Sequence, residues 1–204
     1  NVIIKLKNIK KVILSVVVFI ISQTLLGQET TTKSESNFGI KGGLNYSTVT
    51  QGDFDEGPDP RTSFHIGFFG EIPLVENVFS IQPEFIYSRQ GFENNFTILG
   101  TNYKTTYKID YINVPVLAKI YLGKTFAIEA GPQFGLKINE NVETDNSTSE
   151  TNDVNAFDTA LAAGISLNFD SVFISGRYTY SLNEVVKDSN AKNSVFQVGI
   201  GFKF

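Results

Sequence analysis

The chain ends in the stretch FQVGIGFKF, residues 196–204, in which apolar residues alternate with glycine or polar residues at every position. Side chains two positions apart on a β-strand point to the same face, so this stretch predicts a strand with one apolar and one polar face. The apolar face consists of Phe, Val and Ile, and the other face carries Gln197, Lys203 and two glycines. Such a strand separates two different environments.

The same two-residue period recurs seven times upstream and predicts eight strands in total. In the fourth segment the apolar residues change parity between Ile109 and Ile112, which predicts a β-bulge near Asp110 or Tyr111. The seven further segments begin at Phe38, Phe64, Phe79, Tyr107, Phe126, Phe157 and Val172.

The connections between these segments alternate in length, as in a transmembrane barrel with long outer loops and short periplasmic turns. The polar parity is rich in Gly, Ser and amides, and aromatic residues lie near many strand ends, which favours a membrane barrel over a soluble one. Residues 38–204 are therefore predicted to form an all-β, eight-stranded antiparallel up-and-down transmembrane β-barrel, surrounded by lipids in the outer membrane of a Gram-negative cell. The predicted loops are residues 49–62, 91–104, 139–156 and 182–193, and the predicted turns are residues 73–78, 122–124 and 169–171.

The first 27 residues have the pattern of an export signal. Four lysines, the last of them Lys11, precede a short apolar stretch at residues 12–21. A membrane-spanning helix needs ~20 mostly apolar residues, so a cleaved signal peptide is the better interpretation, with cleavage after Gly27. Residues 28–37 are polar, without periodicity, and are predicted to be a flexible lead-in.

Composition excludes several classes of function. The chain has no Cys, which excludes disulfides, Cys-based metal clusters and a thiol nucleophile. Its net charge is −4, with the basic cluster confined to the predicted signal, so nucleic acid is not an expected partner.

Several motifs resemble those of the PorT-like outer-membrane β-barrel family. The stretch YINVPVLAK, residues 111–119, is similar to its YLEIPLLLK-type motif, with Asn113 where an acidic residue is common. The resemblance spans nearly the whole mature chain and implies an eight-stranded barrel in the outer membrane, without shared catalytic residues. The founding member contributes to a secretion pathway. Further matches are GIKGGLN (39–45), QPEFIYSRQG (82–91), EAGPQFG (129–135) and GRYTYSLNEV (176–185), in which Ser181 replaces the usual Gly.

The inward parity collects charged residues that are expected to pair across neighbouring strands, because an isolated charge in a shielded lumen is costly. This predicts a polar network that fills the lumen, although a proton or ion path uses the same residue types. Phe202 and Phe204 resemble the terminal signal read by the barrel assembly machinery. The predicted network consists of Glu84, Lys119, Glu129 and Arg177 at its centre, with Glu71 and Asp158.

Two catalytic or metal-binding alternatives are weaker. Ser63, His65 and Glu71 share a strand face, which suggests a membrane-embedded lipid- or peptide-modifying hydrolase. Alternate residues on a strand are ~6.5 Å apart, however, which is too far for a base to reach its nucleophile at about 3 Å unless the side chains lean together. The acidic third loop lacks the spacing of a Ca²⁺ loop. The favoured function is a structural or interaction module of the cell envelope, through surface loops or docking to an envelope complex, with no catalysis, cofactor or metal. A component of a protein-secretion apparatus and a narrow pore remain alternatives.

Overall fold

The computed structural model describes residues 36–50, 58–98, 101–144, 147–150, 154–185 and 190–204. Eight strands form a closed ring, because each pairs antiparallel with two neighbours, β1 with β9 and β4 with β5 among them. A ninth strand, β6 (Ser147–Glu150), pairs with β5 outside this ring. The ring strands are β1 (Asn37–Val49), β2 (Asp59–Val75), β3 (Phe79–Ile98), β4 (Thr101–Leu122), β5 (Phe126–Thr144), β7 (Phe157–Phe169), β8 (Val172–Ser181) and β9 (Asn193–Lys203).

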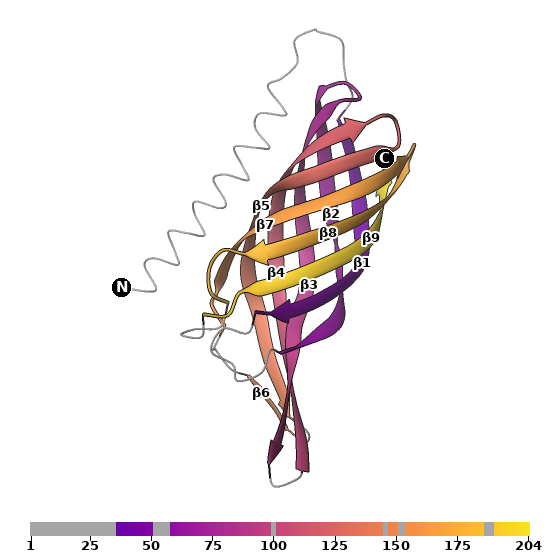
Figure 1. Ribbon diagram of the computed structural model, residues 1–204. Helices are drawn as coiled ribbons and strands as arrows, with labels where there is room; N and C mark the ends of the chain where they lie inside the picture. Colours follow the sequence, from indigo (N-terminus) through magenta and orange to yellow (C-terminus); the bar gives the residue numbers. More distant parts are fainter. Residues whose placement is uncertain (1–35, 51–57, 99–100, 145–146, 151–153, 186–189) are drawn as a thin grey trace, which may run out of the picture. The chain divides into compact units, whose positions relative to one another are not determined.

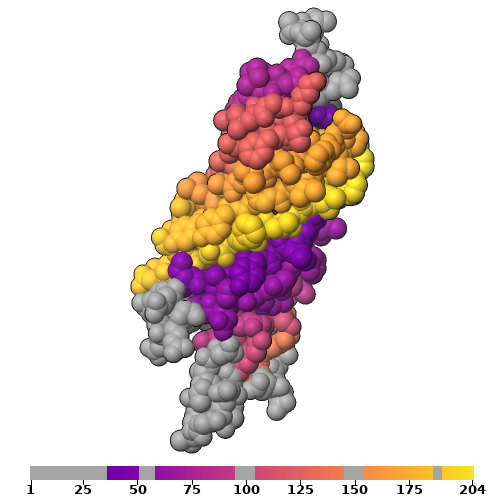
Figure 2. All heavy atoms as spheres, turned by 45° about the vertical axis from the view of Figure 1, so that its right-hand side comes forward, coloured from indigo at the N-terminus to yellow at the C-terminus, as the bar shows by residue number. Residues whose placement is uncertain are grey.

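The first and last strands lie side by side, where indigo meets yellow in Figure 2, and their pairing runs from Gly39↔Lys203 to Val49↔Asn193. Closure of the sheet leaves no unpaired edge within the ring, which is what a sheet in hydrocarbon requires. The predicted eight-stranded antiparallel barrel is confirmed. The predicted signal peptide, residues 1–27, and residues 28–35 of the lead-in lie outside the described residues.

The apolar face of each ring strand points outward, and the polar face points into the lumen. Phe68 is 64% exposed and Ile200 is 45% exposed, whereas Lys119 and Glu129 are at most 1% exposed. This is the inverse of a water-soluble barrel and the arrangement that a lipid surround stabilises. No helix among the described residues is long and apolar enough to cross a membrane.

The ring strands differ greatly in length. β8 has 10 residues and β9 has 11, close to the ~9–11 that span a bilayer, whereas β3, β4 and β5 have 20, 22 and 19. The short turns lie at one end of the barrel, so the additional length of these three strands projects beyond the other end (Figure 1). We call this projection, residues 89–98, 101–110 and 139–144, the loop-end wall.

The loop-end wall corrects two predictions. Residues 91–104 and the start of residues 139–156 were expected to be loops because they are polar, but most of them continue the strands. Phe92 pairs with Tyr107 and Ile98 with Thr101 in the β3–β4 ladder, and Lys108 pairs with Asn141 in the β4–β5 ladder. Polar side chains are normal on a strand that has left the membrane.

The predicted irregularity at Asp110 and Tyr111 is confirmed, but the extra residue is on β5. Asp110 pairs with Asn139 and Tyr111 with Lys137, so Ile138 is skipped, while β4 stays in register with β3. The parity change in β4 therefore has another cause, because Ile109 points inward together with Tyr111.

Candidate functional site

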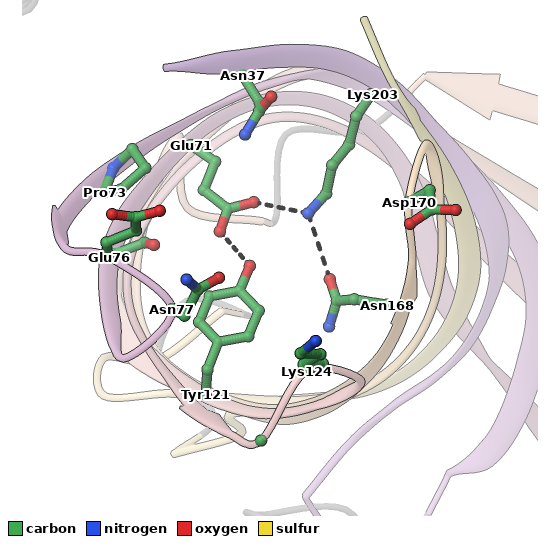
Figure 3. A pocket seen from close by; sticks show the side chains of 12 residues that line it. Asn37, Glu71, Pro73, Glu76, Asn77, Tyr121, Lys124, Asn168, Asp170 and Lys203 are labelled. Atoms are coloured by element: carbon green, nitrogen blue, oxygen red, sulfur yellow. Dashed lines mark hydrogen bonds and ion pairs between the residues drawn. The ribbon is translucent and has the colours of Figure 1, made fainter. Parts of the chain in front are cut away.

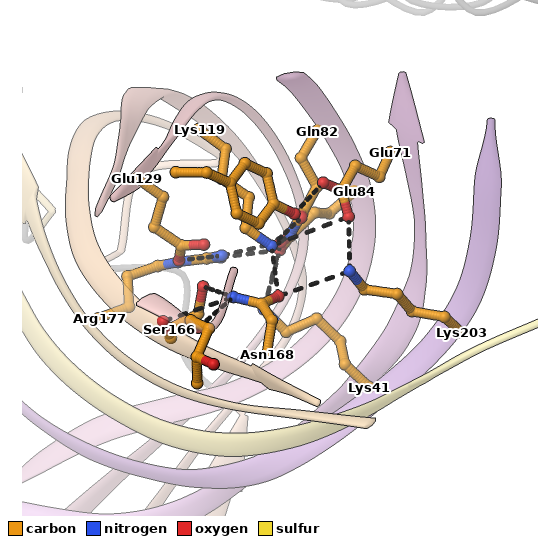
Figure 4. A network of polar contacts seen from close by, with 12 residues as sticks. Lys41, Glu71, Gln82, Glu84, Lys119, Glu129, Ser166, Asn168, Arg177 and Lys203 are labelled. Atoms are coloured by element: carbon orange, nitrogen blue, oxygen red, sulfur yellow. Dashed lines mark hydrogen bonds and ion pairs between the residues drawn. The ribbon is translucent and has the colours of Figure 1, made fainter. Parts of the chain in front are cut away.

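An ion network occupies the centre of the lumen (Figure 4). Arg177 on β8 donates to both carboxylate oxygens of Glu84 on β3, at 2.7 and 2.8 Å, and to Glu129 Oε1 on β5 at 2.7 and 2.8 Å. Lys41 on β1 places its Nζ 3.2 Å from Glu84 Oε1. All four residues are at most 4% exposed. Two cations and two anions thus neutralise one another, as buried charges must if they are to remain ionised.

Lys119 on β4 links this centre to a second group of polar residues. Its Nζ lies 3.1 Å from Asn168 Oδ1, 3.3 Å from Gln82 Oε1 and 3.8 Å from Glu71 Oε2. The Gln82 amide in turn donates to Glu84 Oε1 at 2.7 Å. The hydrogen bonds therefore run without a break from Lys119 to the central carboxylate.

An aromatic ring lies among the ammonium groups. The Phe173 centroid is 5.2 Å from Lys119 Nζ, 5.9 Å from Lys41 Nζ and 6.0 Å from Lys203 Nζ, and Phe69 meets this ring edge-on at 5.2 Å. Cations within about 6 Å of a ring centroid are attracted by its quadrupole. The ring fills the space between the strands without adding a polar group that would need a partner.

The structure brings together Glu71, Glu84, Lys119, Glu129 and Arg177 directly or through one amide. Asp158, the sixth predicted member, lies elsewhere and accepts from Ser181 Oγ at 2.9 Å. Sequence reasoning missed Lys41, Gln82 and Asn168 as members. Their inward parity was visible, but parity does not reveal which inward residues share one level of the barrel.

A neutral layer follows on the loop side of the ions. Asn45 Oδ1 lies 2.8 Å from His65 Nδ1 and accepts from Gln197 Nε2 at 2.9 Å, while Asn45 Nδ2 donates to Ser88 Oγ at 3.0 Å. Ser63 Oγ instead donates to a backbone carbonyl on β3 at 2.6 Å. Glu71 is held by Lys119, Lys203 and Tyr121. Ser63, His65 and Glu71, the residues of the considered hydrolase, therefore contact other groups and not one another.

A buried apolar cluster, which we call the outer cap, lies at the loop end of the lumen. Val154, Val185 and Ala191 come from segments that were predicted to be long outer loops, yet each is at most 1% exposed. One backbone and one side-chain hydrogen bond hold them: Val185 N donates to Ala191 O at 2.8 Å, and the Lys137 side chain donates through Nζ to Val154 O at 2.7 Å. The other members are Val49, Phe92, Ile109 and Tyr111, with Tyr107 packed against them and stacked on Phe92 at 4.4 Å.

The acidic third loop does not assemble a cation site in the part that is described. Glu140 is buried and pairs with Lys137, and Glu143 pairs with Lys108. Asp145 and Asp153 lie outside the described residues, as does the side chain of Glu150. Across the described ranges no cluster of His, Asp or Glu has the arrangement of a metal site.

Comparison with known proteins agrees with this architecture. Neisserial surface protein A has a similar structure, with a TM-score of 0.56 and 13% identity over 84% of this chain and 100% of its own. Ail from Yersinia pestis gives a TM-score of 0.49 and 17% identity over 83% of this chain and 99% of its own. No curated protein sequence matches the chain. A match to the family described as outer membrane protein beta-barrel domain covers residues 22–187. The chain therefore belongs to the outer membrane protein beta-barrel domain family and is located in the outer membrane.

Proposed function

We propose that this protein is a closed, non-conducting barrel that acts as a structural or interaction module of the cell envelope and presents the loop-end wall at the cell surface. The observation that carries the proposal is the filling of the lumen at two levels. The ion network blocks its centre, and the outer cap lies at its loop end. An open path for solutes would require both to be displaced.

The loop-end wall supports an interaction role because its charged side chains are already held in pairs. The Arg89 guanidinium donates hydrogen bonds of 2.7 and 3.1 Å to the two carboxylate oxygens of Asp110, and Lys104 Nζ lies 2.7 Å from Glu93 Oε2. Lys108 pairs with Glu143. A surface built on paired strands needs little ordering when a partner binds, so less free energy is lost on association. Binding residues are frequently carried by such projections from a rigid scaffold.

The experiment removes the tip of the wall and leaves the barrel. Glu93 and Thr106 are directly paired across β3 and β4, so they can be joined by a two-residue Asn-Gly turn that suits a hairpin. We expect cross-linking on intact cells to recover envelope partners with the full chain and to lose them with the shortened chain. Gly176→Ala, on the lipid-facing side, is the control. Identical partners for the shortened chain would refute the interaction role, and stepwise conductance of the full chain in planar bilayers would refute closure.

The finer assignments rest on sequence motifs. The YINVPVLAK stretch at residues 111–119 supports a place among PorT-like proteins and, with it, docking to an envelope complex such as a secretion apparatus. The N-terminal pattern supports export through a cleaved signal, and Phe202 and Phe204 support recognition by the barrel assembly machinery. Deletion of Phe204 is expected to slow insertion of the barrel into the outer membrane.

A further inference from the structure

The short-turn end of the barrel contains a hollow of about 520 Å³, which we call the vestibule (Figure 3). In a barrel of this kind the short turns face the periplasm. Three amide side chains line it, those of Asn37, Asn77 and Asn168, together with the Tyr121 ring and several charged groups. At ~30 Å³ per molecule, its volume corresponds to on the order of seventeen waters, so a small solute of several polar groups fits.

Glu71 and Lys203 form an ion pair on the floor of the vestibule. Glu71 is only 2% exposed, and its Oε1 accepts from the Tyr121 hydroxyl. Its Oε2 lies 3.0 Å from Lys203 Nζ but accepts no hydrogen bond of good geometry. Lys203 also lies 3.5 Å from Asn168 Oδ1 and 6.0 Å from the centroid of the Phe173 ring. The Lys203 ammonium has three donors and a side chain that is 12% exposed, so at least one of its donors can face a ligand.

The rim carries charges of both signs. Figure 3 shows Glu76 and Asp170 on opposite sides of the opening, with Lys124 on the turn that follows β4. All three are exposed. An apolar solute is unsuited to this lining, because it would strip water from polar groups without replacing the lost hydrogen bonds. An uncharged sugar would replace hydrogen bonds but would leave charges of both signs without counter-charges.

We infer that the vestibule binds a short zwitterionic peptide, whose ammonium group faces Glu76 or Asp170 and whose carboxylate faces Lys203 or Lys124. The exposed amide of Asn77 is suited to peptide groups, because it offers both a donor and an acceptor. The inference does not depend on the proposed function, since the vestibule opens at the end of the barrel opposite the loop-end wall.

The test uses the full barrel in detergent micelles and follows backbone amide signals by NMR. Tri-alanine is expected to shift the signals of Asn77 and Gly123 in a saturable way and to leave Ala191, at the other end, unchanged. N-acetyl-tri-alanine amide, which lacks both charges, should bind at least tenfold more weakly, a difference of ~1.4 kcal/mol. Absence of a saturable shift, equal binding of the capped peptide, or saturable binding of maltotriose alone would each overturn the inference.

Rim variants test the residues without disturbing the buried floor. Asp170 has a φ of 32°, in the left-handed region that Asn tolerates, so Asp170→Asn should fold. Combined with Lys124→Gln, it is expected to weaken tri-alanine binding three- to tenfold. Glu184→Gln, at the loop end, is the matched control and should bind as the parent does. Unchanged affinity in the double variant would contradict the assigned rim contacts.

A free oligopeptide carries both charges at its ends, whereas the peptide stems of the cell wall are acylated at the amino end and can offer an ammonium group only from a side chain. Co-sedimentation of the barrel with isolated sacculi, competed away by tri-alanine, would assign the cell wall. Binding of tri-alanine without co-sedimentation would assign free peptides.

Discussion

Replacement of Arg177 by Met tests whether the ion network stabilises the barrel through charge pairing. The variant removes four hydrogen bonds of 2.7–2.8 Å from two buried carboxylates. Glu84 keeps Lys41 at 3.2 Å and Gln82 at 2.7 Å, whereas Glu129 loses the direct partner that the structure gives it. Removal of one member of a buried pair costs ~3–5 kcal/mol, because the remaining charge is left without compensation. We expect a loss of this size in the free energy of unfolding.

A second substitution separates charge from packing. In the double variant Arg177→Met/Glu129→Gln, the Glu129 charge that the first substitution leaves without a partner is removed, and Lys41 still neutralises Glu84. The double variant should therefore recover more than ~1 kcal/mol relative to Arg177→Met alone.

Urea unfolding in lipid vesicles, followed by the different gel mobility of folded and unfolded barrels, measures these free energies. Lys104→Met is the control, because its ion pair with Glu93 on the loop-end wall is half-exposed and such pairs contribute at most ~1 kcal/mol. The reasoning is refuted if Arg177→Met costs no more than this control, or if the double variant is no more stable than the single one.

Three further changes probe the packing, the vestibule floor and the outer cap. A Cβ at Gly43 would lie 2.1 Å from a backbone carbonyl of β9, whereas one at Gly176 meets nothing within 4 Å. In the same unfolding assay, Gly43→Ala should cost more than ~2 kcal/mol and Gly176→Ala less than ~0.5 kcal/mol. Equal costs would contradict the close approach of β1 and β9. Tyr121→Phe removes a hydrogen bond to the buried carboxylate of Glu71 and should lower the free energy of unfolding by ~1.5–3 kcal/mol. Tyr178→Phe, which removes an exposed hydroxyl, should change it little. A reversed order would show that the contact between Tyr121 and Glu71 is weak. Val185→Asp places a charge in the outer cap and should make the outer loops more sensitive to protease. Planar-bilayer recordings of this variant should show no conductance, because the ion network remains. Stepwise conductance would mean that the cap alone closes the lumen.

The strand parity of the barrel could be predicted from sequence because lipid and lumen impose opposite chemistries on alternate residues. What alternation did not reveal was the level at which each strand leaves the membrane. Beyond that level the rule inverts, with polar residues such as Lys108 outside and apolar residues such as Ile109 inside the cap. The parity change between Ile109 and Ile112 was therefore a sign of the membrane boundary on β4, although it was interpreted as a bulge in that strand.

The inward charges could also be predicted, but their partners could not. Arg177 and Glu84 are 93 positions apart and lie on strands that are not neighbours, so their contact depends on the stagger of the whole ring. Asp158 has the same inward parity but a different height, and it binds Ser181 instead. Lys41 was on the inward face of the first strand, yet nothing in its local sequence distinguishes it from an unpaired surface lysine.

The unequal strand lengths give the molecule a front and a back at the cell surface. Among the described residues β3, β4 and β5 project furthest at the loop end, whereas β8 and β9 have about the length that spans a bilayer. In the described part of the chain, the projecting surface therefore lies on one side of the ring. Rotation of the barrel about the membrane normal therefore determines which neighbours in the crowded outer leaflet it can touch.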